Sequence, residues 1–273
     1  MTISTTAGTA TGPSGALDGR SLRGFLPAPT YLRTDIRRVL RNRRALIFTV
    51  LMPGLLYLVF GATQKNSDTV GSGNVAFYVL IGMAVYGAIL AAATNAASVA
   101  LEQQAGWTRT LMMTPLQPAG YVATKVGVAL GMGALPILVL TVAGIATGAH
   151  ATAGVWIACL LIGWLGASVF AAFGLMIGSI MRSDGAMQVM GGVLALLAFA
   201  GNVFVPLKGT MLTIAQFTPM FGIVTLARYP LDHGVTVYGT QISLWIIIAN
   251  VAIWAVVFAS GAAFFYSRST ARQ

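Results

Sequence analysis

Six long apolar segments, almost free of charged residues, limit most strongly what this chain can fold into. A helix needs about 20 apolar residues to cross the hydrocarbon core of a bilayer, and such a segment must be helical there to satisfy its backbone hydrogen bonds. Lys125 is the single Asp, Glu, Lys or Arg in the set, and it lies near the start of its segment, where it can reach the interface. The sequence therefore predicts an all-α integral membrane protein with six transmembrane helices, at residues 45–63, 75–98, 121–148, 155–180, 186–205 and 242–266.

The composition excludes an ordinary soluble domain. Hydrophobic residues make up 57% of the chain and charged residues 8%, against about 25% charged in soluble domains. The formal net charge is +10, but half of the 16 lysines and arginines lie between Arg20 and Arg44, beside the first apolar segment. This placement indicates membrane topology and contact with lipid, so no nucleic-acid partner is expected.

The basic residues also predict the orientation. If there are six spans, one side carries the residues from Arg20 to Arg44, Arg109, Lys125, Arg182, Arg268 and Arg272, and the other carries Lys65, Lys208 and Arg228. By the positive-inside rule both termini are cytoplasmic, and the expected location is the cell (plasma) membrane. The expected organisation is a disordered cytoplasmic tail at 1–27, an amphipathic helix at 28–44, a six-helix membrane domain at 45–266 and a cytoplasmic tail at 267–273.

The segment before the first span has helical periodicity. Leu32, Ile36, Val39 and Leu40 share one face, while Arg33, Arg37, Arg41 and Arg44 share another. A basic amphipathic helix of this kind lies in the headgroup plane of a membrane. We favour such an N-terminal interfacial helix over a solvated basic turn that only sets topology.

The segment 206–232, between the last two predicted spans, is unusually apolar for an external loop. Pro206, Pro219 and Pro230 interrupt it, and it is too short and broken to cross the bilayer. Two re-entrant extracellular half-helices before the last span fit this pattern, because protein would cover their free backbone groups. A plain surface loop is the alternative that the apolar residues disfavour.

The chain lacks the residues that an energised transporter or enzyme needs. No glycine precedes a Lys-Ser or Lys-Thr pair, so there is no phosphate-binding P-loop. The spans also lack the ionisable groups of an ion-coupled carrier and the paired carboxylates or nucleophiles of a membrane enzyme. His150 and His233 are isolated and are interpreted as loop residues. We expect no catalytic residue and no metal site.

Uncharged polar side chains do occur inside the spans. They have two interpretations: hydrogen bonds between helices, which is slightly favoured for each residue, or a weakly polar translocation path. The candidates for such a path are Thr94, Asn95, Ser98, Gln188 and Asn202.

The stretch 101–118, after the second span, is the most specific feature. Glu102 can sit near a helix start, Gly106 allows a bend or a close approach, and Thr114-Pro115 ends a helix. A short, stiff connector of this kind between two membrane helices can transmit a push from a partner protein, because it has little freedom to absorb one.

This stretch resembles the coupling region of ABC-2 type transporter permeases, in which an acidic residue, a glycine and a Leu-x-x-Thr-Pro ending recur in the first cytoplasmic loop. Here they are Glu102, Gly106 and the residues 111–115. Met52-Pro53 in the first span, the basic helix before it and the segment 206–232 are similar to the family as well. Gln103, Gln104 and Trp107 depart from its pattern, which leaves the subfamily open, with drug and antibiotic exporters preferred.

The resemblance implies a fold similar to type V exporters and a set of partners. Two permease domains would pair with two cytosolic ATPase subunits, and a homodimer of this chain is favoured. ATP and Mg would bind to the ATPase, and this chain would bind no cofactor and would not be an enzyme. The residues that the resemblance assigns to ATPase coupling are Glu102, Gly106, Trp107, Arg109, Leu111, Thr114 and Pro115.

The preferred cargo is a hydrophobic or amphipathic small molecule, such as a drug or antibiotic, or a lipid, because the predicted cavity is mostly Ala, Gly, Met and Leu. A polysaccharide or lipid-linked glycan exporter is the alternative within the family. Export is preferred over import, and resistance through multidrug efflux would follow. Outside the family, an ATP-independent channel or carrier and a membrane scaffold or immunity protein remain open. The residues do not decide the cargo, the identity of the ATPase, or homodimer against heterodimer.

Overall fold

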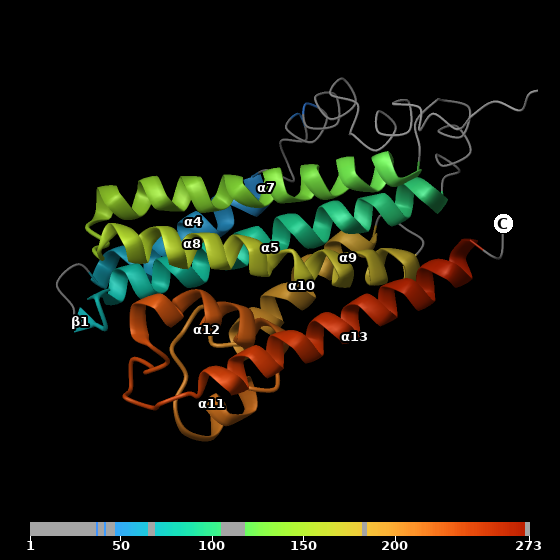
Figure 1. The fold of residues 1–273 in the computed structure, drawn as a ribbon. Coiled ribbons are helices and arrows are strands. Elements are labelled where there is room, and N and C mark those ends of the chain that lie inside the picture. The colour runs from blue at the N-terminus through green and yellow to red at the C-terminus, as the bar shows by residue number, and fades with distance from the viewer. Residues whose placement is uncertain are drawn as a thin grey trace, which may run out of the picture.

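The computed structural model describes residues 47–64, 69–104, 118–181 and 185–270, and in addition Arg37 and Arg41. Within these ranges the chain is almost entirely helical, and the long helices run side by side (Figure 1). Because apolar helices expose no unpaired backbone groups along their length, such an arrangement suits a bilayer.

The chain enters the bundle through a π-helical turn, Ile47–Leu51, that continues as α4, Met52–Phe60. A short antiparallel hairpin follows, formed by β1, Thr69–Val70, and β2, Gly73–Asn74. The hairpin leads directly into α5, Val75–Gln104.

Helix α5 is the central element of the fold. It contacts α4, α7, α8, α9, α10 and α12. In its apolar span 94% of the most hydrophobic window is buried, whereas the corresponding share is 22–39% in the other three long spans. Helix α5 is therefore shielded from lipid by its neighbours, and any movement of α5 must be accommodated by them.

Three helices pack along α5. Helix α7, Pro118–Thr147, runs antiparallel to it, and α8, Ala153–Ala167, returns in the opposite direction. Helix α9, Val169–Ile180, continues α8 after Ser168, and the two together form one span.

The remaining helices form the other side of the bundle. They are α10, Gly185–Ala200, α11, Gly209–Ala215, α12, Pro219–Asp232, and α13, Leu244–Thr270. Helices α11 and α12 are bent by 101° relative to each other. Two helices therefore lie within residues 206–232, and Pro230 lies inside α12 without interrupting it. That they are re-entrant half-helices stays a prediction.

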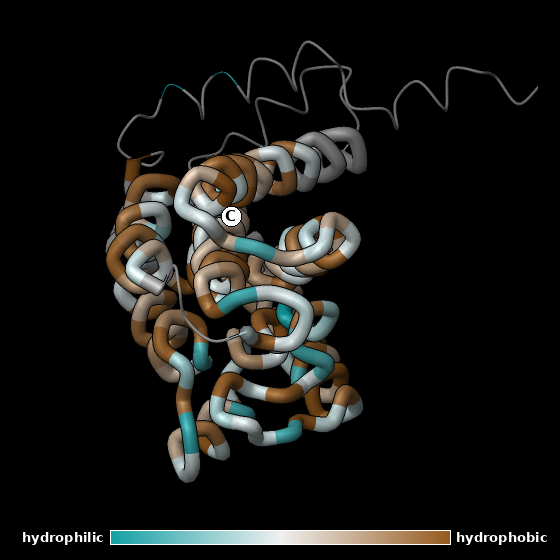
Figure 2. Tube along the Cα trace, turned by 90° about the vertical axis from the view of Figure 1, so that its left-hand side faces the viewer, coloured by the Kyte–Doolittle hydropathy of each residue, from teal (hydrophilic) through white to brown (hydrophobic). Residues whose placement is uncertain are grey.

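We name the two ends of the bundle by their elements. The hairpin end, on the left of Figure 1, contains residues 69–74, 148–152 and 233–243. The connector end, on the right, is where α5, α9 and α13 terminate and where α7 and α10 begin. From the hairpin end, Figure 2 shows hydrophilic residues gathered in turns, with the helices coloured mainly white to brown.

Four helical segments of the described chain are long and apolar enough to cross a membrane: Val75–Ser98, Gly127–Thr147, Ala153–Ile180 and Leu244–Phe265. The bent pair α11 and α12 gives a fifth candidate if it is counted as one span. The first and fifth predicted spans instead correspond to shorter apolar helices, which reach only Phe60 and Ala200. Six spans therefore stay a prediction.

Glycines mark where the helices approach most closely. A methyl group on Gly174 of α9 would collide with the backbone of Ala93 in α5. Gly131 of α7, by contrast, has open space where a side chain would start. Small residues thus bring α9 and α5 into contact, while Gly131 packs against no described part of this chain.

Candidate functional site

Arg228 is the most deeply buried charged side chain among the described residues, with 2% of its surface exposed. Its guanidinium donates hydrogen bonds from Nε to the carbonyl of Tyr78 (3.2 Å), from Nη1 to that of Asn202 (2.7 Å) and from Nη2 to that of Val203 (3.0 Å). Its Cζ atom also lies 3.8 Å from the centre of the Tyr78 ring. The sequence counted Arg228 among the few charges on the side opposite the termini, and its side of the membrane stays a prediction. The structure shows that its side chain is buried and joins α12 to α5 and to the turn after α10.

Gly82 gives the guanidinium its space. A Cβ atom at this position of α5 would collide with Nη2 of Arg228 and would lie 2.6 Å from the carbonyl oxygen of Val203. Burying an unpaired guanidinium would be very unfavourable, so the three carbonyls and the aromatic face are what make the position tolerable. The feature of the sequence that could have indicated this buried site is a single arginine, Arg228, within a largely apolar segment.

Asn202 lies outside the helix in which the sequence placed it. Helix α10 ends at Ala200, and Asn202 has a φ of 60°, a conformation that asparagine tolerates better than most residues. Its Oδ1 accepts a hydrogen bond from the backbone N–H of Leu207 at 2.7 Å, and its own carbonyl receives Arg228. Asn202 is therefore a buried turn residue, and its place in a translocation path stays a prediction.

Asp232 ends α12 one turn after Arg228 and is also buried. Its Oδ1 accepts the N–H of Gly234 at 2.9 Å. Residues 228–234 thus form a polar corner at the hairpin end.

Asn74 holds a second set of polar contacts at the hairpin end. Its Oδ1 accepts the N–H of Phe77 (3.0 Å), which caps the start of α5, and the N–H of His150 (2.9 Å). Its Nδ2 donates to the carbonyl of Gly148 at 2.9 Å. One side chain thereby fixes the beginning of α5 to the turn between α7 and α8.

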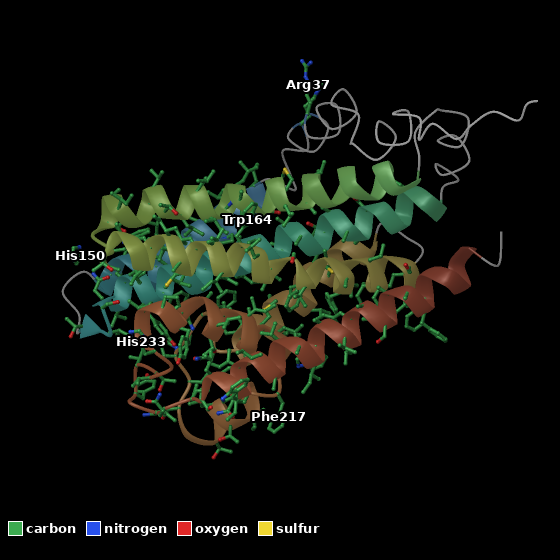
Figure 3. The ribbon with its side chains drawn as sticks, viewed as in Figure 1. Arg37, His150, Trp164, Phe217 and His233 are labelled. Carbon is green, nitrogen blue, oxygen red and sulfur yellow. The ribbon has the colours of Figure 1, made fainter. Side chains whose placement is uncertain are left out.

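The bend between α11 and α12 is held by α13. Asn250 donates from Nδ2 to the carbonyls of Gln216 (2.7 Å) and Thr218 (3.1 Å), and Trp254 donates from Nε1 to that of Phe217 (3.1 Å). These are backbone groups that the end of α11 leaves unpaired. The Phe217 side chain is 76% exposed at the outer side of this bend (Figure 3).

The predicted path residues of α5 bond within their own helix. Thr94 donates to the carbonyl of Leu90 (2.7 Å), Asn95 to that of Ala91 (2.8 Å) and Ser98 to that of Asn95 (2.7 Å). All three side chains are half-buried in the connector half of α5. The structure therefore groups these three, whereas Asn202 lies in the distant turn; Gln188 is in α10, and its side chain is outside the described part.

Of the predicted coupling residues, the structure describes Glu102, which is half-buried in the last turn of α5. Because α5 ends at Gln104 and α7 begins at Pro118 at the same end of the bundle, the connector joins two adjacent helices there. The coupling residues that lie outside the described ranges are Gly106, Trp107, Arg109, Leu111, Thr114 and Pro115.

The interfacial arginines are described in part. Arg37 and Arg41 are exposed and helical, and their spacing places them on one face of a helix. Arg33 and Arg44 lie outside the described residues. His150 and His233 are exposed at the hairpin end, as Figure 3 shows, in agreement with their interpretation as loop residues.

A family model, described as ABC-2 type transporter, matches residues 30–231 of the chain. This match covers the basic segment, the connector and every helix from α4 to α12 except the last residue of α12. The chain belongs to the ABC-2 type transporter family. No curated protein matches the sequence.

Membership of the ABC-2 family fixes the general role. Such chains are the transmembrane components of ABC transporters, and the ATPase activity of these transporters resides in a separate subunit. The chain is therefore a multi-pass membrane protein that works with an ABC ATPase. The absence of a P-loop from its sequence agrees with this division of labour.

Proposed function

We propose that the chain is the permease subunit of an ATP-driven exporter that moves a hydrophobic or amphipathic small molecule, or a lipid, out of the cytoplasm. The observation that carries the proposal is the position of the connector between α5 and α7 in an ABC-2 chain. Helix α5 contacts six other helices, so a force applied next to Glu102 acts on the bundle through its central element.

In this proposal the connector end is cytoplasmic and the hairpin end is external. Arg268 lies in the last turn of α13 at the connector end, and Lys208 precedes α11 on the other side, which is the asymmetry that the positive-inside rule expects. The short helices α4 and α10 complete six spans, and α11 with α12 re-enters from outside.

The ATPase would contact Glu102, Gly106, Trp107, Arg109, Leu111, Thr114 and Pro115. ATP and Mg would bind to that subunit, and its open and closed states would differ in how well they fit the connector, which is the condition for biasing two membrane conformations. Two copies of this chain and two ATPase subunits form the proposed transporter in the cell membrane.

The cargo follows from the weak polarity of the proposed path. The hydroxyls of Thr94 and Ser98 and the amide of Asn95 already donate to α5 carbonyls, which leaves an apolar surface with few free donors. Such a surface suits a drug, an antibiotic or a lipid better than a glycan, which needs many polar partners.

The test is copurification of the tagged chain in mild detergent, with identification of any ATPase by mass spectrometry. Glu102→Ala with Arg109→Ala should reduce the recovered ATPase, because both side chains lie in the proposed contact. Lys208→Ala is the matched control. It removes an exposed cation on the proposed external side, away from the connector, and should leave the amount of recovered ATPase unchanged.

Transport assays in liposomes complete the test. ATP-dependent flux of a hydrophobic dye, lost together with ATPase recovery in the Glu102 and Arg109 variant, is the expected result. Flux without ATP would favour a channel or carrier, and a stable chain that returns without ATPase and without flux would favour a scaffold or immunity protein. Either result would overturn the proposal.

A further inference from the structure

Helices α4, α5 and α7 meet at Gly87, where two proline rings pack against one glycine. A Cβ atom on Gly87 of α5 would lie 2.6 Å from Cβ of Pro136 in α7 and 3.2 Å from Cγ of Pro53 in α4. No side chain fits between the two rings at this point, so both rings pack against α5 at Gly87.

The two prolines lie at different points of their helices: Pro136 is inside α7, and Pro53 is in the first turn of α4. Pro136 lies inside α7 and has no N–H to give to the carbonyl one turn earlier, at Met132. Pro53 follows a π-helical turn, Ile47–Leu51, which replaces regular α-helical hydrogen bonding just before it. Sharp helix bends are found at prolines and at π-helical turns, so both helices can bend at the same depth.

On the hairpin side of Gly87 the three helices are tied together. The hydroxyls of Tyr57 in α4 and Thr147 in α7 are 2.7 Å apart, and because Thr147 donates to the carbonyl of Ala143, Tyr57 donates to Thr147. Asn74, just before α5, bonds to Gly148 and His150, just after α7. These contacts resist sliding of one helix against another.

On the connector side the contacts are of another kind. Asn95 and Thr94 of α5 bond to their own helix and leave α4 and α7 free of them. The carbonyl of Leu130 in α7 accepts the indole N–H of Trp164 in α8 at 2.8 Å, and Figure 3 shows Trp164 between these helices. In the described residues, this part of α7 is therefore joined to α8 by a side-chain hydrogen bond, and it packs on α5 through Ala91, Val128 and Met132.

We propose that Pro53, Gly87 and Pro136 form a bending plane. The π-helical turn Ile47–Leu51 and the connector-side segment of α7 swing about it relative to α5, while α4 and the hairpin-side segment of α7 remain one rigid unit. The glycine provides a flat contact on which both rings turn. Pro136 removes a hydrogen bond that would oppose bending of α7, and the π-helical turn lacks the regular hydrogen bonding that would oppose bending before α4. This inference is independent of the proposed function, because it concerns motion of the chain alone.

The test measures distances between spin labels in the full chain in lipid nanodiscs, by double electron–electron resonance, in a Cys159→Ala background that removes the single cysteine of the sequence. One pair carries labels at Ile47, in the π-helical turn before α4, and at Gly131, on the connector side of Pro136 in α7. The second pair carries labels at Val59 and Ile145, which are 61% and 67% exposed on the hairpin side of the same helices. We expect two maxima for the first pair and a single narrow maximum for the second.

Pro136→Ala restores an N–H inside α7 and should remove the second maximum of the Ile47–Gly131 pair without changing the Val59–Ile145 pair. Leu138→Ala, an exposed substitution in the same helix, is the control and should change neither distribution. Should Pro136→Ala fail to fold, Pro53→Ala carries the same expectation. Equal widths for the two pairs, or two maxima that persist in a folded proline variant, would overturn the proposal.

Discussion

The two ends of the bundle satisfy their polar groups in different ways. At the hairpin end, Arg228 reaches carbonyls that are up to 150 positions away in the sequence, and Asn74 reaches 76 positions to His150. In the connector half, Asn95, Ser179 and Ser260 bond to carbonyls at most four positions away in their own helices. The hairpin end is thus held by bonds between elements, whereas these connector-half side chains hold no second helix.

This difference bears on how an ABC-2 chain can move. A buried hydrogen bond has a direction and a distance, so helices joined by several of them cannot slide without breaking bonds. Contacts between small residues such as Gly174 and Ala93 depend on shape and allow a choice of angles. In the proposed transporter, a force at the connector end would therefore first meet packing contacts such as Gly174 on Ala93, and then the hydrogen bond from Trp164 to Leu130 farther along the helices.

Among the variants that test the difference between the two ends, Arg228→Ala should have the largest effect. We expect the free energy of unfolding to fall by about 3–5 kcal/mol, because three buried carbonyls lose their partner and a cavity remains. The measurement is thermal unfolding of the purified chain in detergent. Arg41→Ala is the matched control and should unfold like the wild type, because Arg41 is exposed. An Arg228→Ala melting curve that overlaps the wild type would show that this network does not hold the hairpin end.

Packing in the connector half is probed by two glycines with opposite surroundings. Gly174→Ala should destabilise the chain by about 1–3 kcal/mol, because the new methyl group collides with the backbone of Ala93. Gly131→Ala should stabilise it by up to about 1 kcal/mol, because the methyl group meets open space and alanine favours helix. The same unfolding assay decides, and changes of equal sign in the two variants would contradict the packing described.

Two asparagines give the smallest expected difference between the two ends of the bundle. Asn74→Ala should lower the free energy of unfolding by about 1–2 kcal/mol, because it removes the cap of α5 and the link to Gly148. Asn95→Ala should change stability by less than about 0.5 kcal/mol, because Asn95 donates only to a carbonyl of its own helix. Hydrogen exchange at the backbone of 75–79 gives an independent readout and should accelerate in the first variant alone.

The sequence predicted the helices best where hydrophobicity is the only requirement. The predicted span at 75–98 has the same bounds as the apolar part of α5. The predicted spans at 155–180 and 242–266 each start two residues from the observed helix starts, at Ala153 and Leu244. It overestimated the fifth span, because residues 201–205 are mostly apolar yet follow the end of α10. Gly201-Asn202 is a turn signal that hydropathy alone overlooks.

The candidate functional residues also differ in how well the sequence could predict their roles. The connector motif was recognisable because its residues are consecutive, and the family match includes them. Asn95 and Asn202 were assigned to one path because both are amides in apolar segments, yet one bonds within a helix and the other shapes a distant turn. Residue type and local hydrophobicity cannot separate these cases, because the difference lies in what the neighbouring elements offer.

By itself, the sequence determined that this chain is helical, enters a membrane and resembles ABC-2 permeases, because long uncharged segments and a motif of neighbouring residues are local properties. Only the tertiary structure decided that the Arg228 side chain is buried, that Asn74 joins two helix ends and that two prolines meet at Gly87. A hydrogen bond or a close contact depends on which backbone arrives beside a residue, and distant parts of the chain supply that backbone.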